Sequence, residues 1–342
     1  MLLIIILSLL ISPAACGSTQ VPHNFTPLLS AGLTYGLPTA ILFAAGDNDN
    51  AGPLLFRLSS LSSGAGFFYL KEYKKAAIAS GTRFLLGETF VQAVNTGPGD
   101  SIGRVNDDFI VLTAVTWQDV QYYNTFSAYN YARVKTKNRG FKTPLHRTSF
   151  KQCITAPFKM DNINRKSTLI PLGLLAAIGT LGYLGVKNDP QYEAFDGDRP
   201  VMIFRGSHRG FSALALSGIR SGMLSMNAGV GEEALFRGVI QTELTELINH
   251  RIIGLMGASA LFGLAHWDSN SSQEERQQKI FTTGLIGAYL GWLYMRNNYR
   301  LEQPIAFHFW WDVIAFTYQF LTDPNKTMGY LNITRQCSFI FP

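Results

Sequence analysis

Long apolar stretches with few or no charges recur along the 342-residue chain, separated by shorter polar segments. A helix needs about 20 mostly apolar residues to cross the hydrocarbon core of a bilayer. The clearest candidate covers residues 168–186, which carry no charge. Five further candidates hold at most one charged residue each: 27–46, 211–226, 252–266, 280–295 and 304–321. The pattern predicts an all-α, polytopic membrane protein.

Two segments in the first half are less apolar. Residues 76–94 carry Arg83 and Glu88, and residues 109–131 begin apolar and then take up Asp119 among several polar side chains. Each segment fits either a membrane span or a helix that lies in the membrane interface. Counting both as spans raises the predicted number of transmembrane helices from six to eight.

Charge is scarce and unevenly distributed. Only 15% of the residues are charged, whereas a soluble chain has about 25%. The net charge of +6 comes largely from the loop 133–166, which holds ten Lys or Arg and a single acid, Asp161. A basic loop beside an apolar span is typical of the cytoplasmic side of a membrane. We therefore interpret the surplus as a topology signal rather than as a nucleic-acid-binding patch.

The chain begins with an apolar run followed by small residues, "MLLIIILSLLISPAAC". This pattern is typical of a secretory signal peptide, and its end is similar to a lipoprotein cleavage box with Cys16 as the lipidation site. Simple cleavage of the leader is the alternative. The other cysteines, Cys153 and Cys337, form no CxxC or zinc-finger spacing with it. A leader of this kind predicts an integral protein of a bacterial inner membrane.

The same features divide the chain into four regions. We expect a leader over residues 1–16, a membrane-associated region of unknown role over 17–166 that ends in the basic loop, a membrane core over 167–325, and a tail over 326–342.

The stretch "GEEALFRGV" places three charged residues between apolar segments. Charges inside a membrane are costly, so they mark functional positions by default. Glu233 and Arg237 are four residues apart and can form an ion pair on one helix face. Glu232 points about 100° away from Glu233 and has no such partner on its own helix. The spacing thus predicts a supporting ion pair next to a free carboxylate, which is what a general base requires.

Two later apolar helices carry histidines. "FGLAH" places Phe262 and His266 four residues apart, and "HFWWD" does the same for His308 and Asp312. Single histidines in apolar helices are usually structural. A glutamate, two histidines and an aspartate that converge around one water would instead form a hydrolytic site.

These three motifs in this order resemble the CPBP family, which comprises the CAAX-prenyl-protease type II and bacteriocin-processing (Abi) intramembrane proteases. The motifs are Glu232-Glu233-Ala-Leu-Phe-Arg237, Phe262-Gly-Leu-Ala-His266 and His308-Phe-Trp-Trp-Asp312. The resemblance covers about residues 210–321, and the region before about residue 160 resembles no family that we can name.

The resemblance implies a helical membrane protein that hydrolyses a peptide bond in or near the bilayer. By this resemblance Glu232 and His266 activate the attacking water, and His308 with Asp312 stabilises the oxyanion or completes the water site. Glu233 and Arg237 orient the other residues. The implied substrate is a membrane protein or peptide. Asp312 departs from the prenyl-processing members, which often have Asn there.

Zinc is an open alternative, because two histidines and a carboxylate suit a catalytic zinc ion. Members of the family have been described both as metalloproteases and as metal-independent glutamate proteases. If zinc is bound, its ligands would come from Glu232, His266, His308 and Asp312.

Two other functions compete with proteolysis. One is a non-catalytic membrane immunity or scaffold protein, which broken motifs would favour, but all three are intact here. The other is a proton-coupled transporter, which internal inverted repeats would favour, and the sequence shows no repeat.

Overall fold

The computed structural model describes residues 24–45, 52–97, 107–146, 148–187, 189, 193–267 and 271–325. The predicted leader with Cys16 and the predicted tail with Cys337 lie outside these residues. Within them almost all regular structure is helical, which confirms the all-α prediction. The exception is a short hairpin that the hydropathy pattern does not indicate.

Five helices form the first half of the described chain. They are α2 (Thr26–Ala45), α3 (Gly52–Ser62), α4 (Ala65–Tyr69), α5 (Tyr73–Asn95) and α7 (Asp108–Lys135). The two ambiguous apolar segments of the sequence thus correspond to α5 and α7. The longest helix, α7, starts at an N-cap residue, Asp107, whose carboxylate accepts hydrogen bonds from the backbone N–H groups of Phe109 and Ile110.

The predicted basic loop contains short helical turns and leads into the most apolar helix. These elements are α8 (Phe150–Thr155), the 3-10 turn η2 (Ala156–Phe158), α9 (Met160–Ile163) and α10 (Lys166–Val186). A capping box at Ser149 and Gln152 fixes the start of α8.

The second half holds the motif-bearing helices. They are α11 (Gly210–Glu233), the π-helical segment η3 (Ala234–Gln241), α12 (Thr242–Ile248), α13 (Arg251–Ala265), α14 (Gln273–Arg296) and α15 (Glu302–Thr322). π-Helical turns are rare and occur often at functional sites. Here the π-helical segment starts directly after the two glutamates of the first motif.

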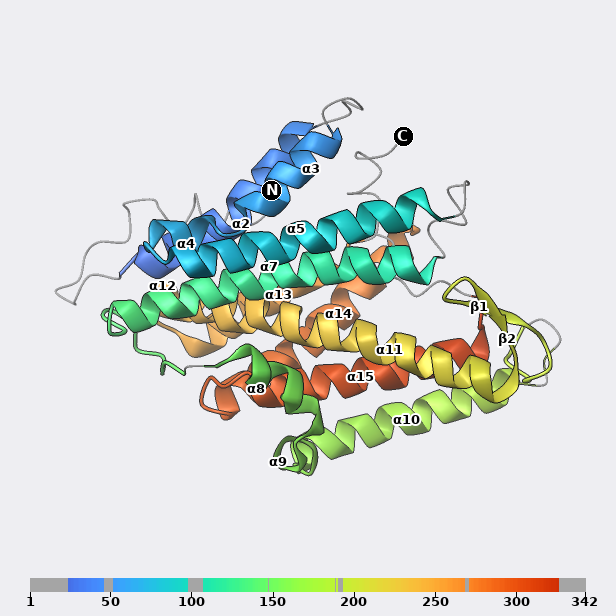
Figure 1. Ribbon diagram of the computed structural model, residues 1–342. Helices are drawn as coiled ribbons and strands as arrows, with labels where there is room; N and C mark the ends of the chain where they lie inside the picture. Colours follow the sequence, from blue (N-terminus) through green and yellow to red (C-terminus); the bar gives the residue numbers. More distant parts are fainter. Residues whose placement is uncertain are drawn as a thin grey trace.

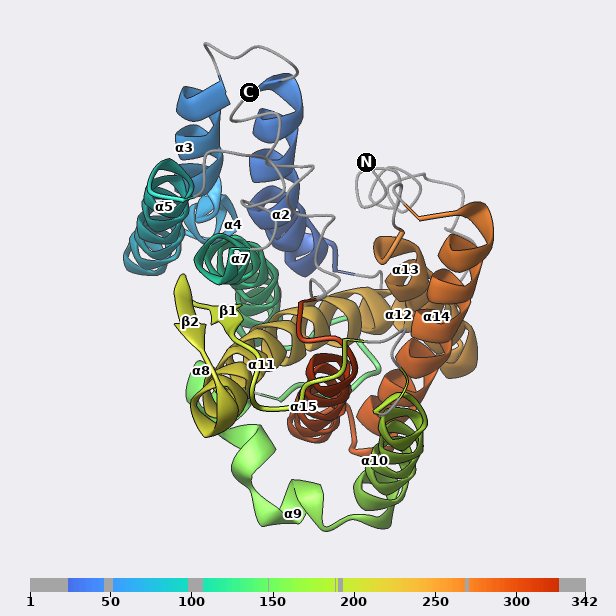
Figure 2. The same ribbon diagram turned by 90° about the vertical axis from the view of Figure 1, so that its right-hand side faces the viewer.

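The long helices lie side by side in the order α5, α7, α11, α15 and α10, each in contact with the next (Figure 1). Seen along these helices, α7 lies on one side of α11, and α13 and α14 lie on the other (Figure 2). The helix α13 packs against α14 and against the π-helical segment. This arrangement brings the ends of the three motifs toward one point.

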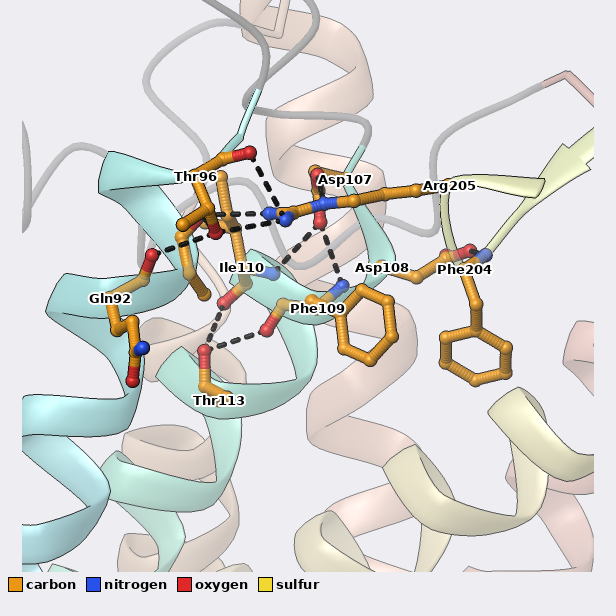
Figure 3. Close-up of polar contacts among 10 residues, drawn as sticks. Gln92, Thr96, Asp107, Asp108, Phe109, Ile110, Thr113, Phe204 and Arg205 are labelled. Carbon is orange, nitrogen blue, oxygen red and sulfur yellow. Dashed lines mark hydrogen bonds and ion pairs between the residues drawn. The ribbon is translucent and has the colours of Figure 1, made fainter.

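The hairpin connects α10 to α11 and contacts the end of the α5–α7 pair. It pairs β1 (Val201–Ile203) with β2 (Gly206–His208) in antiparallel register. Phe204 and Arg205 form its two-residue turn with positive φ angles of 49° and 63°, as a type I′ turn requires. Arg205 reaches the carboxylate of Asp107 at 2.5 Å and the carbonyl oxygen of Ala93 at 2.7 Å (Figure 3). The turn thereby joins the ends of two helices.

Two of the described helices are long and apolar enough to cross a membrane by length and composition: residues 26–44 of α2 and the whole of α10. The predicted number of six to eight transmembrane helices therefore stays a prediction. Most of the apolar surface of α10 is uncovered; Ile178 and Leu181 are 67% and 70% exposed. Such a surface is typical of a helix that faces lipid.

Candidate active site

The residues of the three motifs come together at one place in the fold. Glu232 and Glu233 form the last turn of α11, His266 directly follows α13, and His308 and Asp312 lie in the first half of α15. The nearest nitrogens of His266 and His308, both Nε2, lie 3.9 Å from the same Glu232 oxygen, Oε2. Nε2 of His308 also lies 3.5 Å from Oδ2 of Asp312. Three separate helices thus supply one cluster.

Glu233 and Arg237 form the ion pair that their spacing predicts. Nε of Arg237 lies 3.2 Å from Oε2 of Glu233, and both side chains are almost fully buried, at 1% and 0% exposure. Arg237 also donates a hydrogen bond to the carbonyl oxygen of Gly287 at 3.0 Å and lies over the ring of Phe262. The pair therefore ties α11 to α13 and α14.

Glu233 has a second partner that the sequence does not reveal. Its Oε1 lies 2.8 Å from Nδ1 of His308, which as the imidazole donor fixes the orientation of that ring. The other ring nitrogen of His308 then points toward Glu232 and Asp312. Glu233 is in this way a positioning residue for the cluster as well as the partner of Arg237.

His266 is oriented by its own helix. Its Nδ1 lies 2.8 Å from the carbonyl oxygen of Phe262, and a carbonyl can only accept, so Nδ1 carries the hydrogen. Nε2 of the neutral ring is then an acceptor that faces Glu232. The ring of Phe262 packs between the two histidines, with centroids 4.7 Å from His266 and 6.2 Å from His308. This explains why the motif combines Phe with His.

The cluster opens into a cavity of about 280 Å³. One wall comes from α7, and the opposite wall comes from α13 and α14. Trp311 and Phe316 of α15 and Ile286 of α14 make part of the lining apolar. Lys279, near the start of α14, adds a cationic group. The cavity therefore combines a polar cluster with apolar surface, as sites for peptide and lipid-like ligands commonly do.

Asp119 of α7 is a site residue that sequence reasoning missed. It lines the same cavity, is 7% exposed, and interacts electrostatically with Glu232, His308 and Asp312. It reaches the cluster because α7 and α11 approach closely at Gly231, where an added Cβ would lie 2.6 Å from Cβ of Asp119. The available signal was an acid in the middle of an otherwise uncharged helical segment.

Cys153, in α8, takes no part in the cluster. Its side chain is fully buried, and burial raises the pKa of the thiol to about 12. A thiol in this state is neutral and unreactive near neutral pH.

The donor atoms of the cluster are of the kind that catalytic zinc uses. Among the described residues, however, no group of three or more His, Cys, Asp or Glu side chains is positioned to hold a metal ion. The residues as placed do not fit a metal, so no step proposed below passes through one. Zinc stays a prediction that metal analysis of the purified protein can test.

The fold and the cluster define an all-α protein with a partly buried Glu–His–Asp site at the junction of several helices. Residues 216–314 match the family model described as type II CAAX prenyl endopeptidase, Rce1-like. This match confirms the resemblance to the CPBP family drawn from the motifs, and it covers less than a third of the chain. No curated protein and no solved structure matches the chain.

Proposed function

We propose that this protein is an intramembrane endopeptidase in which Glu232 and His266 activate the attacking water. One observation carries the proposal. Oε2 of Glu232 is buried without a hydrogen-bond partner among the described residues, and Nε2 of both histidines lies 3.9 Å from it. These separations are too long for direct hydrogen bonds, but a single water could contact the carboxylate and an imidazole at once.

In the proposed reaction Glu232 accepts a proton from this water, and the oxygen of the water attacks the carbonyl carbon of the peptide bond. Nε2 of His266 accepts the second hydrogen bond of the water and orients it. Glu232 then passes the proton to the leaving nitrogen as the C–N bond breaks. Water is thus consumed, and a carboxylic acid and an amine are released.

His308 and Asp312 are proposed to stabilise the oxyanion. His308 faces Glu233 through one ring nitrogen and Asp312 through the other. Carboxylates at both nitrogens favour a doubly protonated imidazole. Its Nδ1–H donates to Glu233, so the Nε2–H, 3.5 Å from Asp312, is the donor directed toward the developing negative charge. Asp312 then acts through His308, which accounts for an acid where prenyl-processing members often have Asn.

The proposed location is a membrane, as for other members of the family. The apolar helices α2 and α10 support it, together with the uncovered apolar surface of α10. The matched family is named for prenylated CAAX substrates. We propose a broader substrate class here, a membrane protein or peptide, and a bacterial inner membrane as its location, because the N-terminal sequence is similar to a bacterial leader.

The test compares protein N-termini in cells that express the wild type or Glu232→Gln at equal levels. We expect a set of new N-termini with the wild type and its loss in the variant, because the amide cannot accept the proton. Glu274→Gln is the matched control, since Glu274 is an exposed acid of α14 away from the cavity. Identical N-termini in all three strains would contradict the proposal and favour the non-catalytic immunity or scaffold function.

A further inference from the structure

A complete face of α7 lines the cavity, although α7 lies outside the residues that match the protease family. Val115, Gln118, Asp119 and Tyr122 all contribute to the lining. Their positions are i, i+3, i+4 and i+7, which is the spacing of one face of an α-helix. The region before the protease core, whose role the sequence leaves open, therefore forms one wall of the site.

This wall is held firmly against the protease core. Asp108 at the start of α7 forms an ion pair with Arg220 of α11 at 2.9 Å, with both side chains largely buried. Two turns further on, Asn227 donates a hydrogen bond to the hydroxyl of Thr116 at 2.8 Å. At the level of the cavity the two helices approach closely at Gly231. A wall fixed at three levels can discriminate between ligands by shape.

Asp119 gives this wall its polar centre. The side chain is 7% exposed and lines the cavity together with Glu232, His308 and Asp312. A ligand that supplies a hydrogen-bond donor to a carboxyl group largely removed from water gains affinity. An extended peptide carries such donors in its backbone N–H groups. Val115, one turn before Asp119, lies next to the apolar side chains of Phe316 and Leu224.

On the basis of the proposed protease function, we propose that the α7 face selects the peptide substrate. Asp119 accepts a hydrogen bond from a substrate backbone N–H beside the bond to be cleaved. Val115 limits the size of the neighbouring apolar side chain of the substrate. The specificity of the enzyme is thus set by a helix outside the segment that carries the catalytic motifs.

The experiment uses the purified full-length protein in detergent micelles and a proteome-derived peptide library, with cleavage sites identified by mass spectrometry. Val115→Ala is expected to shift the accepted residue at one position beside the cleavage site toward larger apolar side chains. Val111→Ala is the matched control: it makes the same change one turn earlier on α7, outside the cavity lining. The control is expected to keep the wild-type preference.

Asp119 is tested on individual peptides that the wild type cleaves. Asp119→Ala is expected to raise KM about tenfold, the effect of one lost hydrogen bond in a buried site, with a smaller change in kcat. Asp119→Asn keeps an acceptor oxygen and is expected to stay within about threefold of the wild-type KM. A loss that came only from misfolding would lower the active fraction and leave KM unchanged.

The outcomes separate this inference from the proposed function. If the wild type cleaves the library and Val115→Ala has the same preference as Val111→Ala, the inference is overturned and the protease function stands. If the wild type cleaves nothing, both are overturned. Should Asp119→Ala fail to fold, Val115→Ala still decides the question, because that change is small and its control is Val111→Ala.

Discussion

The two adjacent glutamates of the first motif differ in how closely they are paired. Glu233 is fully buried and contacts Arg237 at 3.2 Å and His308 at 2.8 Å. Glu232 has one oxygen that is buried without a hydrogen-bond partner among the described residues. Removing one partner of a buried ion pair leaves the other charge uncompensated and is strongly destabilising, whereas a carboxylate without such a partner persists where function requires it. Glu233 therefore has a structural role, and Glu232 has a proposed chemical role.

This contrast predicts opposite effects of the same substitution. Glu233→Gln should lower the free energy of unfolding by about 3–5 kcal/mol, because the Arg237 guanidinium is left buried without its counter-charge. Glu232→Gln should leave stability unchanged or raise it slightly, while abolishing proteolysis. Unfolding of the purified variants in micelles, followed by circular dichroism during denaturant titration, measures both. Equal losses of stability in the two variants would argue against the assigned division of roles.

The contacts within one helix could be predicted from the sequence, and those between helices could not. The spacing of four residues was sufficient for the Glu233–Arg237 pair and for the approach of His308 to Asp312. The contact between Glu233 and His308 joins residues 75 positions apart. It depends on how α11 packs against α15, which no local spacing specifies. For the same reason, the sequence did not indicate that Asp119 belongs to the site.

At the scale of elements, the contact between α7 and α11 places Asp119 in the cavity. The two helices can approach because Gly231 has no side chain; an added Cβ would lie 2.9 Å from the Asp119 Cα. That atom belongs to the backbone, so it cannot move aside without shifting α7. Gly222 of the same helix has no such role, since a Cβ there would meet nothing within 4 Å.

Gly231→Ala should therefore separate α7 from α11 and lower the free energy of unfolding by about 1–3 kcal/mol, as overpacking does. Proteolysis should fall as well, because Asp119 and Glu232 move apart. Gly222→Ala is the matched change on the same helix, and it should be neutral or stabilise by about 0.5–1 kcal/mol. Thermal unfolding and cleavage rates of the two variants provide the comparison. If the two variants have the same thermal stability and cleavage rate, the close approach of α7 and α11 is not required for function.

The hydropathy pattern did not predict two elements, the π-helical segment and the hairpin. The π-helical segment Ala234–Gln241 follows the glutamates, and its eight residues are all buried. An apolar pattern distinguishes helix from strand but does not separate an α-turn from a π-turn. The hairpin at residues 201–208 is too short to show alternation, and Phe204 and Arg205 are not typical residues for its positive φ angles. The contacts of Arg205 with α5 and α7 hold it in place instead.

At the scale of the whole molecule, the buried site lowers the hydropathy of the helices that carry it. Helices α11 and α15 and the π-helical segment carry Glu233, Arg237, Gln241 and His308, and all four side chains are buried inside the protein. Such residues lower the mean hydropathy of a helix without placing polar groups in contact with lipid. The sequence therefore identified α10 clearly, because α10 has no part in the site. The number of spans is a question for experiment.

Two matched substitutions can test whether α10 crosses a membrane. Ile178 near the middle of α10 and Met202 in the hairpin are similarly exposed, at 67% and 62%. If α10 crosses a bilayer, Ile178→Arg places a charge in hydrocarbon at a cost of about 2.5–3.5 kcal/mol, whereas Met202→Arg, outside any span, costs little. We expect the amount of folded protein in the membrane fraction to fall for Ile178→Arg alone. If α10 were surrounded by water, both positions would tolerate arginine about equally, because the two side chains are similarly exposed. Equal amounts of the two variants in membranes would therefore contradict a membrane-spanning α10, and with it the location of the proposed reaction.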